Sequence, residues 1–151
     1  MTGVAEEARV ERGPQRRKAG KRSSRRPLIL VVEDEKNDWE IYGKMLWYNG
    51  YDVLYAADGE AGLKLARESP PDLVVADLIL PKLNGLELCV ALKQDSRTRD
   101  IPVIMLTARA RSEFEERSRK AGCALYLEKP TSPVTLLHEV EELIGRPPPA
   151  A

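Results

Sequence analysis

The sequence predicts an α/β fold built around a parallel sheet, and two observations carry this prediction. Short apolar runs rich in Val, Ile and Leu alternate with segments of helical period and length. These runs are too uniformly hydrophobic for an antiparallel sheet with one face in water, so they suit a parallel sheet covered by helices on both faces. Five such units in 151 residues make one domain with a single core.

Five strands are expected, each followed by a helix. The predicted strands are 28–33, 52–57, 72–77, 102–107 and 124–129. The predicted helices are 36–49, 58–68, 84–95, 110–121 and 132–144. Turn residues agree with these bounds, because Gly50 and Gly122 stand where helices should end, and Asp58 and Ser132 where helices should begin. Pro102 opens the fourth strand, the position where a missing N–H does least harm.

Charge is distributed unevenly along the chain. Residues 1–27 carry nine Lys or Arg and three Asp or Glu, a net charge of +6. The remainder of the chain carries −6, so the whole chain is formally neutral. The segment 16–26 has no aromatic or branched apolar residue, so 1–27 is predicted to be a disordered basic arm. Contact of this arm with nucleic acid or an anionic membrane is the alternative. A folded domain at 28–145 and a flexible Pro-rich tail at 146–151 complete the chain.

The composition limits the kinds of site and the location. No apolar stretch reaches about 18 residues and the N-terminus is too polar for a secretory signal, so we expect a cytoplasmic protein without a membrane span. Cys89 and Cys123 are 34 positions apart, and the chain has one His. Neither a disulfide framework nor a Cys/His metal site is indicated, and both cysteines are expected to be buried thiols in a reducing compartment.

Polar residues follow four of the predicted strands at the point where each strand ends. Glu33, Asp34 and Glu35 end the first strand and Asp77 ends the third; Thr107-Ala108 and Lys129-Pro130 end the fourth and fifth. Ligands of open parallel sheets bind beyond the carboxyl ends of the strands. The sequence therefore predicts that these side chains converge on one rim.

The side chains expected at this rim suit phosphoryl transfer. Carboxylates close together raise one another's pKa, and a hard divalent cation such as Mg²⁺, which prefers oxygen ligands, would compensate their charge. Lys129 and Thr107 offer an ammonium and a hydroxyl that can bind the oxygens of a tetrahedral anion. A metal, an ammonium, a hydroxyl and a carboxylate acceptor together favour transfer of a phosphoryl group onto the carboxylate.

Four motifs, in this order and spacing, resemble the receiver domain of bacterial two-component response regulators, of the stand-alone, chemotaxis-regulator-like kind. The motifs are VVEDE (31–35), DLILPKLNG (77–85), VIMLTA (103–108) and YLEKP (126–130). The resemblance covers about 28–145. It implies a flavodoxin-like, doubly wound, five-stranded parallel sheet of order 2-1-3-4-5 with five helices.

The resemblance also implies roles for single residues at the acidic end of the site. Asp77 would be the phosphoacceptor. Mg²⁺ would be bound by Asp34, by Asp77 itself and by the carbonyl oxygen of Ile79, with Glu33 acting as a ligand through water.

Further roles are implied at the fourth and fifth strands. Thr107 and the amide of Ala108 would hold phosphoryl oxygens, and Lys129 would pair with the phosphoryl group. Tyr126 matches the switch aromatic that turns inward on activation together with Thr107. The peptide bond between Lys129 and Pro130 is expected to be cis.

The expected function is that of a self-phosphorylating switch rather than an enzyme with an external turnover substrate. The phosphoryl donor would be a phosphohistidine of a histidine kinase or of a histidine phosphotransfer protein, and a downstream protein would bind a phosphorylation-dependent face. No DNA-binding domain is expected, and the protein should be a monomer or a weak dimer. The alternatives are a receiver fragment of a larger regulator with a missing output domain, or a passive phosphorelay carrier.

Two other classes are disfavoured by the residues at the rim. Phosphatases that form an aspartyl phosphate carry a second acid two residues after the nucleophile, and Ile79 occupies that position. A flavodoxin-type electron carrier needs a loop of phosphate-binding donors after the first strand, where the three carboxylates of 33–35 would repel a flavin phosphate.

Overall fold

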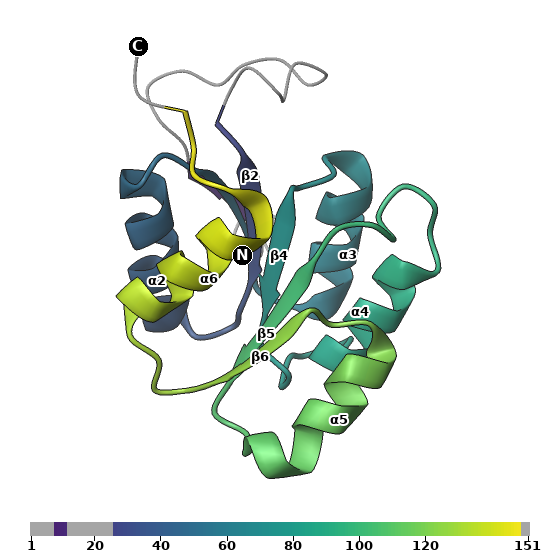
Figure 1. Ribbon diagram of the computed structural model, residues 1–151. Coiled ribbons are helices and arrows are strands. Elements are labelled where there is room, and N and C mark those ends of the chain that lie inside the picture. Colours follow the sequence, from purple (N-terminus) through teal and green to yellow (C-terminus); the bar gives the residue numbers. More distant parts are fainter. Residues whose placement is uncertain (1–7, 12–25, 149–151) are drawn as a thin grey trace.

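The protein, described here for residues 8–11 and 26–148 by a computed structural model, is built on one sheet. Its parallel strands are β2 (Leu28–Val32), β3 (Asp52–Ala56), β4 (Leu73–Ala76), β5 (Val103–Thr107) and β6 (Leu125–Glu128). Their hydrogen-bonded order is β3-β2-β4-β5-β6. Counted along the five parallel strands this is the order 2-1-3-4-5, so the predicted topology is confirmed (Figure 1).

Helices cover both faces of the sheet, which explains the uniformly apolar strands. One face carries α2 (Lys36–Tyr48) and α6 (Pro133–Ile144), and the other carries α3 (Gly59–Glu68), α4 (Gly85–Lys93) and α5 (Arg111–Ala121) (Figure 1). Successive residues of a strand point to opposite faces, so both sets of side chains in β2 are buried. The prediction of a doubly wound sheet with five helices is therefore confirmed.

Polar caps fix where several helices begin. The side chain of Asp58 accepts a hydrogen bond from the first turn of α3, and that of Ser132 does the same for α6. Asn84 and Glu87 form a reciprocal capping box at the start of α4. At the end of α5, Gly122 has a φ of 104°, a conformation that favours glycine.

A sixth strand departs from the prediction of a disordered arm. β1 (Ala8–Glu11) pairs antiparallel with β3 at the outer edge of the sheet, with Ala8 opposite Ala56. An edge strand offers unpaired N–H and C=O groups, and a segment can bind them through its backbone without an apolar composition. Composition alone therefore missed these four residues. The rest of the basic arm, 1–7 and 12–25, lies outside the described residues.

The last arginine of the predicted arm contacts the folded domain. The Arg26 guanidinium donates hydrogen bonds to the carbonyl oxygens of Trp47 and Tyr51, at 2.6 and 2.8 Å. Its Nε lies 3.4 Å from a carboxylate oxygen of Asp52. At the other end α6 stops at Ile144, and residues 146–148 are neither helix nor strand.

None of the helices in the described part of the chain is long and apolar enough to cross a membrane.

Candidate functional site

The carboxyl ends of four parallel strands bring the predicted polar residues to one rim of the sheet. Glu33 follows β2, Asp77 follows β4, Thr107 ends β5 and Lys129 follows β6. These strands are adjacent and parallel in the order β2-β4-β5-β6, so residues far apart in the sequence end side by side. The convergence predicted from the strand ends is therefore observed.

Lys129 lies at the centre of this rim. Its Nζ is 2.7 Å from Glu33 Oε1, 2.7 Å from Asp38 Oδ2 and 3.1 Å from Asp77 Oδ2. One ammonium group thus donates its three hydrogens to three carboxylates. The local charge remains negative, because one cation faces three acids.

Asp38 was not anticipated from the sequence. It lies in the first turn of α2 and its side chain is 33% exposed. The signal was its place in the first turn of the helix that directly follows Glu33, because the start of that helix lies near the carboxyl end of the first parallel strand. Asp38 is a third carboxylate contact for Lys129, in addition to the two that the strand ends predicted.

Burial sets the ionisation of the two most enclosed groups. Burial raises the pKa of Glu33 from its ordinary value of 4.5 to about 7; the hydrogen bond from Lys129 opposes this rise and the charge of Asp77 adds to it. Burial alone would lower the pKa of Lys129, but hydrogen bonds to Asp38 and Glu33 outweigh burial, and the pKa of Lys129 is raised. Lys129 is therefore a fixed positive charge at neutral pH.

The raised pKa of Glu33 predicts how the stability of the metal-free protein depends on pH. The native state holds the Glu33 proton more tightly than the unfolded chain, so the free energy of unfolding should fall as pH rises from 4.5 through about 7. The Glu33 contribution to this fall should be roughly 2–3 kcal/mol. Urea unfolding with a chelator at pH 5 and pH 8 measures it. A Glu33→Gln variant should lose less stability than wild type over this interval, and an equal loss would contradict the assignment.

Backbone amides hold two of the carboxylates in place. Asp77 Oδ1 accepts a hydrogen bond of 3.0 Å from the amide of Ile79, and Glu33 Oε2 accepts one of 3.1 Å from the amide of Glu35. The Ile79 side chain is half exposed and borders the rim. Asp34 is also exposed, and it is not among the three carboxylates that Lys129 binds.

Thr107 and Tyr126 are connected through the backbone of Arg109. Thr107 is buried, and its Oγ1 accepts a long hydrogen bond of 3.4 Å from the Arg109 amide. Tyr126 is only 2% exposed, and its hydroxyl donates to the Arg109 carbonyl oxygen at 2.8 Å. The predicted switch aromatic therefore points inward in this structure. Ala108, between Thr107 and Arg109, is exposed.

Arg111 joins the start of α5 to β6. Its guanidinium donates to the Tyr126 carbonyl oxygen at 2.9 Å, and its backbone N–H donates to Glu128 Oε1 at 3.1 Å. α5 has no side-chain cap from its own N-cap residue, Ala110, so the Glu128 carboxylate from β6 binds an N–H that the helix leaves free. The peptide bond between Lys129 and Pro130 is cis, as the resemblance implied.

The donor set of the rim fits a hard divalent cation. Among residues 8–11 and 26–148, no three acidic, His or Cys side chains are already gathered around a common metal position, and Lys129 lies between the carboxylates. Several oxygen donors with excess negative charge nevertheless match what Mg²⁺ prefers. If Mg²⁺ binds, Asp34, Asp77 and the Ile79 carbonyl oxygen would hold it directly, and Glu33 would hold it through water.

The family model of the response regulator receiver domain matches residues 29–141. This chain belongs to that family. Receiver domains of response regulators accept a phosphoryl group and act as signalling switches, so the family and general function expected from the motifs are confirmed.

Known proteins resemble this receiver over most of their own length. The polar-differentiation response regulator DivK of Brucella anthropi is 36% identical over 117 residues, which are 78% of this chain and 95% of DivK. The solved structure of the receiver domain of sensor histidine kinase PA1611 from Pseudomonas aeruginosa has a magnesium ion coordinated in its active site cleft. It is 31% identical, with a TM-score of 0.74 over 80% of this chain and 98% of that domain. Chemotaxis protein CheY4 of Vibrio cholerae is 28% identical, with a TM-score of 0.74 over 78% and 98%.

Proposed function

We propose that Asp77 of this receiver accepts a phosphoryl group from a phosphohistidine of a histidine kinase or histidine phosphotransfer protein, in a Mg²⁺-dependent reaction that the receiver itself catalyses. In this transfer the P–N bond of phosphohistidine breaks and a P–O bond to an Asp77 carboxylate oxygen forms, while the imidazole leaves. Protein residues contribute chiefly by positioning and by neutralising charge.

The single observation that carries this proposal is the placement of the Lys129 ammonium 3.1 Å from the Asp77 carboxylate. Lys129 is protonated at neutral pH and is already in contact with the acceptor group. It can therefore bind an oxygen of the phosphoryl group once Asp77 carries that group. Bound Mg²⁺ would neutralise further negative charge on the transferred group. The Ile79 amide holds the Asp77 carboxylate in a fixed orientation.

Incubation of the protein with acetyl phosphate and Mg²⁺ tests this proposal. Intact-mass measurement should show the gain of one phosphoryl group, and a chelator should prevent it, because an incoming anion would then meet uncompensated carboxylates. Borohydride reduction converts an aspartyl phosphate to homoserine, so peptide sequencing can locate the site. A protein that gains no phosphoryl group, or that carries it at Asp34, would refute the assignment.

Signalling would follow from a change in the face built by α5, β6 and α6. The hydroxyl of Thr107 can bind a phosphoryl oxygen only if it turns toward the rim, and Thr107 is linked to the buried Tyr126 through the backbone of Arg109. Phosphorylation then adds an interaction between the Thr107 hydroxyl and a phosphoryl oxygen that is stronger in the conformation with Thr107 turned toward the rim. The population of molecules therefore shifts toward that conformation. A downstream protein would bind this face, and the receiver would act in the cytoplasm as a monomer or weak dimer. The passive carrier and the receiver of a larger regulator are the competing proposals.

Beryllofluoride, which binds to an aspartate carboxylate as a mimic of the phosphoryl group, tests this coupling. Amide chemical shifts in residues 107–128 should change when beryllofluoride and Mg²⁺ are added. In Thr107→Val, which keeps the shape of the side chain but lacks the hydroxyl, the changes should be confined to residues around Asp77. Thr135→Val, at an exposed position on α6, is the matched control and should respond like wild type. Wild-type shifts that stay fixed beyond the rim would favour the passive carrier.

A further inference from the structure

The two cysteines of the chain meet in the core on the far side of the sheet from α2 and α6. Cys89 lies on α4, and Cys123 lies in the short segment between α5 and β6. Their Sγ atoms are 3.1 Å apart, and the Cys123 thiol donates a hydrogen bond to Cys89 Sγ. Both thiols are free. The sequence predicted two buried thiols and gave no reason to pair them, because 34 residues separate them.

The local packing keeps this pair together. The Cys89 thiol also donates a hydrogen bond of 3.3 Å to the carbonyl oxygen of Ala121, the last residue of α5. Cys89 therefore contacts the end of α5 as well as the segment that follows it. Cys89 is fully buried and Cys123 is nearly so, and the two sulfurs lie next to each other within the core.

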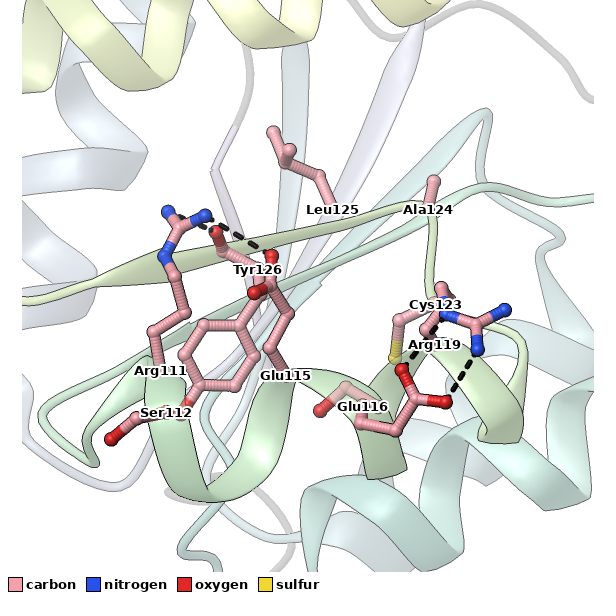
Figure 2. A pocket seen from close by; sticks show the side chains of 10 residues that line it. Arg111, Ser112, Glu115, Glu116, Arg119, Cys123, Ala124, Leu125 and Tyr126 are labelled. Carbon is pink, nitrogen blue, oxygen red and sulfur yellow. Dashed lines mark hydrogen bonds and ion pairs between the residues drawn. The ribbon is translucent and has the colours of Figure 1, made fainter.

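A cavity borders one of the two cysteines. Cys123 lines a cavity of about 440 Å³ between α5 and β6, together with Arg111, Arg119 and Tyr126 (Figure 2). Cys89 is not part of the cavity lining. An oxidant that enters the cavity therefore reaches Cys123 first, with Cys89 immediately beyond it.

We propose that Cys89 and Cys123 are a redox modification site, at which a peroxide converts the two thiols into an intramolecular disulfide that ties α4 to the segment preceding β6. In the first step the Cys123 sulfur attacks the O–O bond of hydrogen peroxide, giving a sulfenic acid and one water. In the second step Cys89 Sγ attacks Cys123 Sγ, the S–O bond breaks and a second water leaves. Two thiols and one peroxide thus give one disulfide and two waters.

The sulfurs are arranged for the second step. A disulfide needs an S–S distance of about 2.05 Å, so the two atoms must approach by about 1 Å. In the reduced pair the hydrogen bond that Cys123 donates lowers the pKa of the Cys89 thiol, and the same hydrogen bond and burial raise the pKa of Cys123. The first step is therefore slow, and the pair stays reduced unless peroxide is abundant.

The bond would restrain the part of the molecule proposed to change on phosphorylation. Tyr126 follows Cys123 by three residues and lines the same cavity. A covalent link from α4 to Cys123 would limit how far this segment can move; that consequence for signalling rests on the proposed function. The formation of the disulfide does not rest on it.

Treatment of the folded, unphosphorylated protein with hydrogen peroxide tests the proposal. After alkylation of free thiols under native conditions, intact mass should show the loss of two hydrogen atoms, reversed by dithiothreitol. Tryptic peptides containing Cys89 and Cys123 should be linked to each other. The melting temperature should rise by on the order of 5 °C, because the cross-link restricts the unfolded chain. Amide hydrogens of residues 121–126 should exchange more slowly than in the reduced protein.

Cys89→Ser and Cys123→Ser are the control variants, and neither should lose two hydrogens. The wild-type measurement stands without them if either variant fails to fold. Wild-type protein that remains unmodified, that gains oxygen without losing two hydrogens, or that forms disulfide-linked dimers on a non-reducing gel would overturn the proposal. Unchanged hydrogen exchange in the oxidised protein would overturn the claim that the bond restrains this segment.

Discussion

Replacing Asp77 with asparagine is expected to abolish phosphoryl incorporation from acetyl phosphate. Asparagine keeps the size and shape of the side chain, but its amide is a poor nucleophile and carries no charge for Lys129 to neutralise. The fold should be retained, because Asp77 lies at the rim rather than in the apolar core. Intact mass after a fixed incubation with Mg²⁺ should show one added phosphoryl group in wild type and none in Asp77→Asn.

Asp100→Asn is the matched control for this measurement. Asp100 is exposed in the connection that precedes β5, at the opposite end of that strand from Thr107. It should accept no phosphoryl group in wild type, and its replacement should leave the mass gain unchanged. Equal incorporation in Asp77→Asn and wild type would mean that another carboxylate is the acceptor, with Asp34 the first to examine.

The fold was predictable because the short apolar runs that predict strands alternate with segments of helical period along the chain, and the predicted helix caps lie at their boundaries. The residues of β2 to β5 are all buried, which is what uniformly apolar runs indicate for a sheet covered on both faces. Caps such as Asp58 and Ser132 act through local hydrogen bonds, so they can be found without knowledge of the tertiary structure. The strand order, by contrast, came from the resemblance and not from the periodicity.

Contacts between residues that are far apart in the sequence could not be predicted in the same way. The contact between Lys129 and Asp38 spans 91 positions, and it depends on how α2 packs against α6, the helix that follows Lys129. The pairing of Cys89 with Cys123 likewise depends on the packing of α4 against α5. β1 pairs with β3 through its backbone, so the side chains of β1 do not predict this pairing. Strand ends predicted that Glu33, Asp77 and Lys129 would converge, but not which oxygens Lys129 would bind.

Removal of the Lys129 ammonium should be the second most damaging change at the site. Lys129→Met keeps a flexible stem of similar length but leaves Glu33, Asp38 and Asp77 without their common cation. We expect phosphoryl incorporation from acetyl phosphate to slow by about 10²-fold or more, the loss typical when a preorganised charge-stabilising group is removed. Phosphate incorporation with time, measured by intact mass, gives the rate. Lys64→Met, at an exposed position of α3, is the matched control and should retain the wild-type rate.

The pH dependence of the Lys129 variant separates a loss of local charge from general damage. The hydrogen bond from Lys129 lowers the pKa of Glu33, so in the metal-free Lys129→Met protein that pKa should rise beyond about 7 and Glu33 should stay protonated to higher pH. The fall in the free energy of unfolding with pH, measured with a chelator, should therefore move to higher pH than in wild type. Asp38→Asn leaves Lys129 in contact with Glu33 and Asp77, and its rate should stay within a few-fold of wild type. A Lys129→Met protein with the wild-type rate would show that the ammonium only balances charge in the resting site and takes no part in transfer.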